Sequence, residues 1–150
     1  MGAVLVLYHS QQYGNTQAMA EAVAEGARAA GAQVTLVNTN EQRLDMEEYR
    51  KIDAIAFGSP DYYSYIAGGL KVFLDDWHIA KKSDPQGLTG KPYGLFYSHG
   101  GTGKVRKALE DLGSRLGTKV GETVESHGRP DDAALEACRK LGEQLAEAVG

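Results

Sequence analysis

Residues 3–16, AVLVLYHSQQYGNT, decide the fold that we predict for this chain of 150 residues. The run AVLVLY at 3–8 is apolar throughout, without the alternation of a strand that faces water on one side. Such a run is typical of a central parallel strand buried on both faces. Polar residues follow it, and the alanine-rich segment 16–30 then predicts a helix that stops at Gly31. The stretch therefore predicts a strand, a polar loop and a helix.

The same alternation of strand and helix continues to the end of the chain. Further strands are predicted at 34–37, 52–57, 93–97 and, more weakly, 118–125. Further helices are predicted at 67–81, at 104–116 and from Pro130 to about residue 148, with a short one within 41–51. Gly58-Ser59-Pro60 is expected to break the third strand. Strands that alternate with helices predict one α/β domain over 1–150, with a five-stranded parallel sheet and helices on both faces.

Composition and charge exclude several classes of protein. The net charge of −4 and a pI near 5.5 argue against nucleic acid as a partner, because duplex binding needs a clustered basic surface. The single cysteine, Cys138, excludes an intrachain disulfide and fits a reducing compartment. No apolar run reaches the length of a membrane span, and no basic segment precedes the first strand. We expect a cytoplasmic protein with no membrane partner.

Three loops are expected to form the functional site. In an open α/β sheet, ligands bind beyond the carboxyl ends of the strands. Segments 10–16, 59–65 and 98–103 follow the first, third and fourth strands, and all are rich in Gly, Ser, Thr or Tyr. We call them the first, second and third loop. Their common place at one edge of the sheet is a stronger indication of a site than any one of them.

The first loop has the composition of a phosphate-binding loop without cations. Hydroxyls, amides and free backbone N–H groups at a helix start favour a bound anion, and the helix dipole adds to this. The loop contains no Lys or Arg, so neutral donors would hold the phosphate. The alternative is that Ser10 or Thr16 only caps the helix.

The residues of the second loop could contact a flat ring, and those of the third loop would let a ligand come close to the backbone. Three tyrosines among residues 62–65 could stack on a ring, or instead pack on the next helix or cover a dimer surface. The glycines of the third loop would let a ligand approach the backbone. The segment ending in Gly103-Lys104 is not a nucleotide-binding P-loop, because Ser98 replaces the required first Gly and Val105 the metal-binding hydroxyl. We therefore exclude ATP and GTP.

These three loops resemble the FMN-binding loops of the flavodoxin family. The first loop, ending in Gly14-Asn15-Thr16, is similar to the family's phosphate loop but has one residue more between Ser10 and Gly14. Segments 53–60 and 69–75, DAIAFGSP and GLKVFLD, resemble the WrbA-type branch of quinone reductases, although the long insertion of that branch is absent. The resemblance covers almost the whole chain. It implies a short-chain flavodoxin-like fold with strand order 2-1-3-4-5 and non-covalently bound FMN.

The resemblance also implies a role for each loop. The first loop would hold the phosphate, the second would line one side of the isoalloxazine ring, and the third would line its pyrimidine end. The implied cofactor-binding residues are Ser10, Gln11, Gln12, Tyr13, Gly14, Asn15, Thr16, Ser59, Pro60, Asp61, Tyr62, Tyr63, Ser98, His99, Gly100, Gly101, Thr102 and Gly103.

Three functions remain open at this point. The first is an electron carrier between redox partners, in which Asp61, Asp75 and Asp76 could lower the flavin potential or steer a basic partner, or could simply be solvated. The second is an NAD(P)H-dependent reductase of quinones or other small molecules, in which His99 could donate a proton or merely hydrogen-bond. A flavin-binding module without enzymatic activity is a third alternative. Receiver and dinucleotide-binding domains are excluded, because their acidic residues and glycine motif are missing.

The remaining distinctive residues have structural interpretations. Cys138 shares a helical spacing with leucines and is expected to pack in the core. Trp77 is expected in the core or at its edge. His78 and His127 are expected to be isolated, and no spacing typical of a metal site is present.

Overall fold

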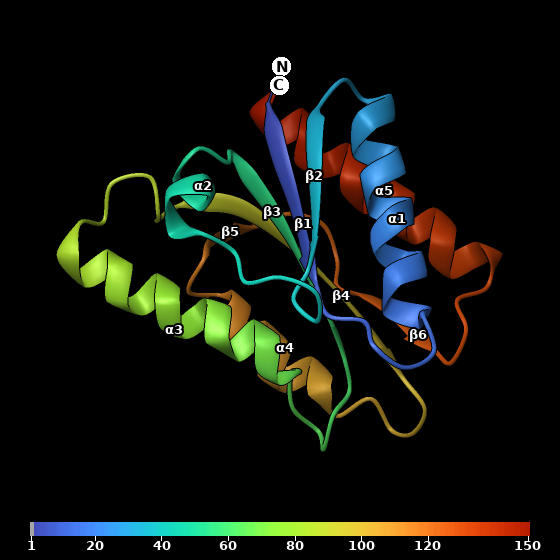
Figure 1. The fold of residues 1–150 in the computed structure, drawn as a ribbon. Helices are drawn as coiled ribbons and strands as arrows, with labels where there is room; N and C mark the ends of the chain where they lie inside the picture. The colour runs from blue at the N-terminus through green and yellow to red at the C-terminus, as the bar shows by residue number, and fades with distance from the viewer. Residues whose placement is uncertain (1) are drawn as a thin grey trace.

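The computed structural model describes residues 2–150 (Figure 1). Its strands are β1 (Ala3–Tyr8), β2 (Gln33–Asn38), β3 (Ala54–Pro60), β4 (Lys91–His99), β5 (Gly117–Lys119) and β6 (Val124–His127). Its helices are α1 (Asn15–Ala29), α2 (Met46–Arg50), α3 (Gly68–Ser83), α4 (Val105–Gly113) and α5 (Asp132–Val149).

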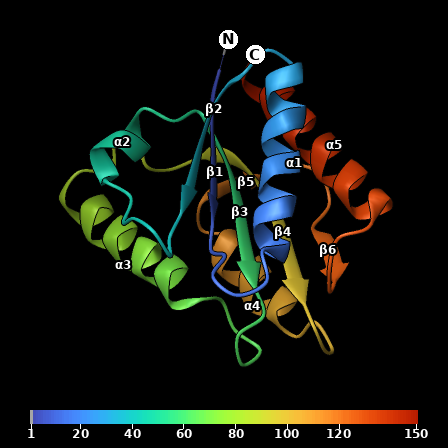
Figure 2. The same cartoon turned by 45° about the vertical axis from the view of Figure 1, so that its right-hand side comes forward.

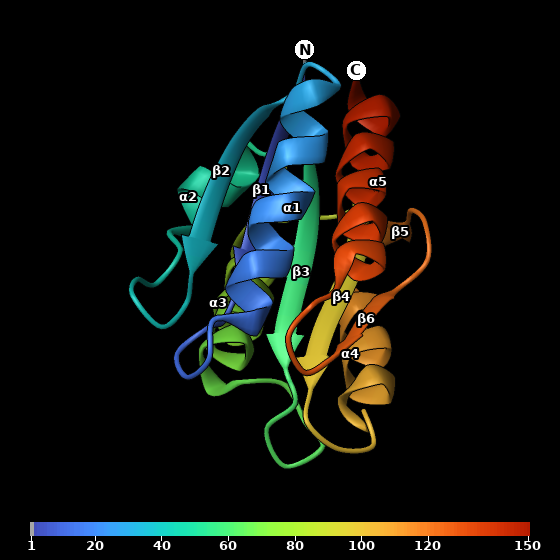
Figure 3. The same ribbon diagram turned by 90° about the vertical axis from the view of Figure 1, so that its right-hand side faces the viewer.

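All strands run parallel in the order β2-β1-β3-β4-β5, and β6 also pairs with β4. This confirms the predicted strand order and fold class. Helices α1 and α5 cover one face of the sheet, while α2, α3 and α4 lie on the other (Figure 3). The carboxyl ends of β3, β4 and β6 point to the same edge (Figure 2). That edge carries the loops from which we expected a site.

The third strand does not end where we predicted. Gly58, Ser59 and Pro60 continue β3 and pair with residues 96–98 of β4. Gly58 is required for close packing rather than for a turn, because a Cβ there would come within 2.1 Å of the Phe96 ring. Pro60 is tolerated because it is the last residue of the strand, where a missing N–H disrupts little of the ladder.

The predicted fifth strand is divided in two. β5 pairs with the beginning of β4, at 91–93, and β6 pairs with its end, at 96–99. Between them the chain turns at Gly121, whose φ of 68° lies in the left-handed region. The last helix begins later than predicted, because Asp131 accepts a hydrogen bond from the Ala134 N–H at 2.8 Å and forms its N-cap. Pro130 therefore lies before the helix.

The two faces of the sheet are packed with different side chains. On the α1/α5 face, glycines let the helices touch: a Cβ on Gly142 would lie 1.9 Å from the Val23 carbonyl oxygen. Cys138 is fully buried on this face, which confirms its predicted packing role. On the opposite face Trp77 is 4% exposed and donates a hydrogen bond from Nε1 to the Leu88 carbonyl at 2.8 Å. Within residues 2–150, every helix is too short or too polar to traverse a bilayer.

Candidate functional site

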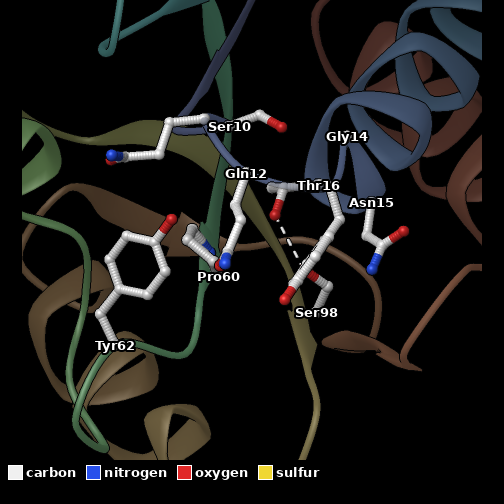
Figure 4. A pocket seen from close by; sticks show the side chains of 10 residues that line it. Ser10, Gln12, Gly14, Asn15, Thr16, Pro60, Tyr62 and Ser98 are labelled. Carbon is white, nitrogen blue, oxygen red and sulfur yellow. Dashed lines mark hydrogen bonds between the residues drawn. The ribbon is translucent and has the colours of Figure 1, made fainter.

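A small hollow opens where the first loop meets the ends of β3 and β4 (Figure 4). Its lining comes from three separate parts of the chain, and each part belongs to one of the predicted loops. The lining residues are Ser10, Gln11, Gln12, Tyr13, Gly14, Asn15, Thr16, Pro60, Tyr62 and Ser98. All of them are among the predicted site residues. The sheet topology therefore brings the whole first loop together with one or two residues from each of the others.

The start of helix α1 faces this hollow without a cap. Gly14 is the N-cap residue, with a left-handed φ of 78°, and the described part of the chain, residues 2–150, contributes no side-chain cap to this helix. The first intrahelical bond runs from the Ala18 N–H to the Gly14 carbonyl at 3.0 Å, so the preceding N–H groups have no partner within the helix. The alternative that Ser10 or Thr16 merely caps the helix is therefore wrong.

The chemistry of this helix start suits an anion. Its first turn contains no acidic residue, and its unpaired N–H groups coincide with the positive end of the helix dipole. The Thr16 hydroxyl lies 2.8 Å from the Ser98 hydroxyl, and both side chains are buried at the base of the hollow. Figure 4 shows these two hydroxyls facing one another beneath the loop. These neutral donors fit a phosphate group such as the one that FMN carries.

The base of the first loop is held by residues that the sequence analysis missed. The buried Asn38, at the end of β2, accepts a hydrogen bond from the Ser10 N–H at 3.0 Å and donates one to the Ser10 carbonyl at 2.9 Å. Thr39 places its hydroxyl 2.8 Å from Nδ1 of His9. An asparagine at a strand end carries no distinct signal in one sequence, because its partner is 28 residues away.

The second loop forms a tight hairpin turn. Tyr62 and Tyr65 pair as an antiparallel bridge, and the two residues between them, Tyr63 and Ser64, both have positive φ, 57° and 64°. These signs define a type I′ turn, for which Asn-Gly is the usual sequence. Tyr62 lines the hollow, whereas the side chain of Tyr63 is completely exposed. The tyrosines thus separate into one that faces the hollow and one that faces solvent.

Two polar residues beside this turn are engaged in holding it. The Asp61 carboxylate accepts hydrogen bonds from the Ser64 N–H at 2.8 Å and from the Val105 N–H at 3.2 Å. The buried Ser59 hydroxyl accepts from the Ala67 N–H at 3.1 Å and donates to the Pro60 carbonyl. Neither residue lines the hollow.

The third loop begins with two residues that point to opposite sides of β4. Ser98 faces the hollow, and His99 faces away from it. Nε2 of His99 lies 2.8 Å from Glu125 Oε2, and its ring stacks on that of His127, with centroids 4.8 Å apart and planes 11° apart. The expectation that His127 is isolated is therefore wrong: β6 pairs with β4 in a register that places His127 opposite His99.

This histidine pair has electrostatic consequences for its neighbours. The hydrogen bond from His99, followed by that from Tyr97, lowers the pKa of Glu125. Nδ1 of His99 is buried and has no hydrogen-bond partner within residues 2–150. His99 is 8% exposed and its Nε2 is engaged, so the ring is not directed toward a substrate in the hollow. The geometry offers no support for His99 as a proton donor there.

The other predicted site residues do not line the hollow. They are Ser59, Asp61, Tyr63, His99, Gly100, Gly101, Thr102 and Gly103. Of the two acidic residues on α3, Asp75 pairs with Lys71 at 2.5 Å and Asp76 pairs with Arg43 at 2.7 Å. These cations compensate the two negative charges. This agrees with the interpretation that the acidic residues are simply solvated on the helix surface, and it argues against a negative field at the flavin.

Comparisons with known proteins identify the family. The sequence model of the flavodoxin family matches residues 6–142. A flavodoxin of Aquifex aeolicus is 33% identical, over 99% of this chain and 88% of that protein. NAD(P)H dehydrogenase (quinone) 3 of Rhizobium meliloti is 32% identical, over 85% of this chain but 61% of its own length.

Solved structures agree with this assignment. A flavodoxin from the domain Archaea superposes with a TM-score of 0.82 at 26% identity, over 97% of both chains. A WrbA-like flavodoxin of Agrobacterium tumefaciens superposes with a TM-score of 0.80 at 25% identity, over 99% of this chain and 97% of its own. The family match, the strand order and the uncapped start of α1 lead to one conclusion: this chain belongs to the flavodoxin family, whose members bind FMN and transfer electrons.

Proposed function

We propose that this protein carries electrons between redox partners through non-covalently bound FMN. The observation that carries the proposal is the open edge at which the three loops meet, where Tyr63 is fully exposed and Tyr13 is 77% exposed. A redox partner could approach a ring bound beside these loops without the movement of a lid. The flavin supplies the redox chemistry when bound, and the protein sets its position and access.

Different residues of the chain would bind different parts of FMN. The N–H groups at the start of α1 and the hydroxyls of Ser10, Thr16 and Ser98 would hold the phosphate. Pro60 and Tyr62 would lie against the ring, since they line the hollow from the second loop. The third loop, from His99 to Gly103, would border the ring's pyrimidine end.

A second candidate is an NAD(P)H-dependent reductase of quinones or other small molecules. The similarity to the quinone dehydrogenase of Rhizobium meliloti favours it. That protein extends beyond the matched part, since the chain spans 61% of its length. A reductase also needs room for a nicotinamide beside the flavin, which the carrier does not.

A reductive titration would separate the two candidates. The purified protein would be loaded with FMN and titrated anaerobically with dithionite, while a parallel sample receives NADH or NADPH, and the visible spectrum is recorded. For a carrier, we expect reduction in two one-electron steps and no rapid response to NAD(P)H. Rapid bleaching by either nucleotide would instead establish the reductase. Failure to bind FMN would contradict both.

A further inference from the structure

We infer that Asn38 is a positioning residue for the phosphate loop and that it makes this protein discriminate FMN from riboflavin, which lacks the phosphate. The side chain touches no expected ligand atom itself. It acts through the peptide of Ser10, where the chain leaves β1 and enters the first loop. The inference rests on the proposed placement of the phosphate at the first loop.

The register of the sheet explains why an amide is needed at this position. β1 and β2 pair until Tyr8 lies opposite Asn38, and the last backbone bond runs from the Thr39 N–H to the Tyr8 carbonyl at 2.8 Å. A continued β2 would next have supplied partners for the N–H and C=O of Ser10. Instead the chain turns away, and the Glu41 N–H bonds back to the Asn38 carbonyl at 2.9 Å.

The Asn38 side chain replaces that missing strand. Its Oδ1 accepts from the Ser10 N–H and its Nδ2 donates to the Ser10 carbonyl, so one amide satisfies both backbone groups of one residue. Oδ1 also accepts from the Asn40 N–H at 3.0 Å, which fixes the turn after β2. Asn38 and Ser10 are 8% and 9% exposed, so water cannot readily take over these bonds.

Fixing this peptide sets the direction of the loop that follows. Ser10 is the first residue lining the hollow, and only three residues separate it from Gly14, the N-cap of α1. A rotation of the Ser10 peptide would therefore move donors of the loop relative to the start of α1. Phosphate binding by neutral groups depends on several donors meeting at one point. Binding of the ring depends on the other two loops and does not require these donors to meet.

The test compares FMN with riboflavin in matched variants. Asn38→Leu keeps a side chain of similar size but removes all three hydrogen bonds, and Asn40→Ala, at an exposed neighbouring amide, is the control. We expect Asn38→Leu to weaken FMN binding about tenfold or more, since two buried backbone groups lose their partners. Riboflavin affinity should stay within about twofold, and Asn40→Ala should change neither. Flavin fluorescence titrations at constant ionic strength give both constants.

A second variant gives a readout that a general loss of structure would not produce. In Asn38→Asp the ionised carboxylate can accept from Ser10 but cannot donate to its carbonyl, so FMN affinity should be reduced at pH 7. At this buried position desolvation is expected to raise the pKa of the carboxyl, so that it takes up a proton as the pH falls toward 5 and can then both donate and accept, as the amide does. The ratio of wild-type to variant FMN affinity, measured at each pH, should therefore shrink. Taking the ratio cancels the titration of the FMN phosphate itself.

The outcomes separate this inference from the proposed site. Equal losses of FMN and riboflavin affinity in Asn38→Leu, or a ratio for Asn38→Asp that is constant with pH, would overturn the role of Asn38. A wild-type protein that binds FMN and riboflavin equally well would instead overturn the placement of the phosphate. If Asn38→Leu does not fold, the pH series on Asn38→Asp still decides.

Discussion

The first and third loops both lead into a helix through a left-handed glycine, yet the surroundings of the two glycines differ. Each approaches a helix through a glycine in the left-handed region, Gly14 with φ 78° before α1 and Gly103 with φ 74° before α4. A Cβ on Gly14 would meet nothing within 4 Å, whereas one on Gly103 would lie 3.1 Å from both Glu125 Oε2 and His99 Nε2. The first loop is thus open above its glycine, and the third is closed by side chains of β4 and β6.

This difference separates a loop that is open to a ligand from a loop that contributes to the stability of the fold. The first loop is neutral and leaves its helix start unpaired, so its donors are available to an anion. The third loop lies over a His–Glu pair and is tied to the following segment by the Gly128 N–H, which bonds to the His99 carbonyl at 2.7 Å. Substitutions in the first loop should therefore affect FMN affinity most, and those in the third loop protein stability.

The largest effect on stability is expected from Gly103→Ala. The substitution forces an alanine into the left-handed region and also presses its methyl group against the His99–Glu125 pair. We expect the free energy of unfolding to fall by about 2–3 kcal/mol in urea denaturation of the flavin-free protein. Gly100→Ala is the control, because a Cβ there meets nothing within 4 Å and Gly100 has no positive φ. Similar losses in both variants would remove the contrast between the loops.

A smaller loss of stability, but a larger loss of affinity, is expected from Gly14→Ala. Only backbone strain opposes this alanine, so the free energy of unfolding should fall by about 1–2 kcal/mol. FMN affinity should fall further than this strain explains, because the N–H groups of the first turn lose their direction. Gly14→Asn should be milder, since asparagine tolerates the left-handed region. Unchanged FMN affinity in Gly14→Ala would argue against a phosphate at this helix start.

The smallest effect is expected from Glu125→Gln and depends on pH. Contact with His99 lowers the pKa of Glu125 in the folded protein, so ionised Glu125 stabilises the fold above the unfolded carboxyl pKa of about 4.3. That contribution is lost as the pH falls through the lower folded pKa. Because the Glu125 side chain is 46% exposed, its contribution to the free energy of unfolding should be only about 0.5 kcal/mol. Urea denaturation should show the variant less stable than wild type at pH 6 and equally stable near pH 3; a constant difference would contradict this.

The elements that were predicted correctly have local causes. β1 was recognisable because residues on both faces of a central parallel strand are apolar. The first loop was recognisable because its polar residues stand between that strand and a helix, and it alone supplies most of the hollow's lining. Both signals lie within 3–16, where neighbours in sequence are also neighbours in space.

The errors concern residues whose surroundings come from distant parts of the chain. Gly58-Ser59-Pro60 has a composition typical of a strand break, yet all three residues stay in β3 and pair with β4. Glycine is needed at position 58 because the Phe96 ring occupies the space that a side chain would fill. His127 reads as isolated, yet it stacks on His99 because β6 pairs with β4. Tyr63-Ser64 gave no sign of a type I′ turn, since neither residue is typical of one.

The amino-acid sequence alone predicts the α/β class, the three loops at the edge of the sheet and, through the family resemblance, the strand order. These follow from periodicity and from short motifs, which are written in consecutive residues. Three features are visible only in the folded chain: the start of α1 is uncapped, Asn38 holds the peptide of Ser10, and His99 turns away from the hollow. The last two depend on strand register, because a shift of one residue along β2 or β6 would bring different side chains to the same place.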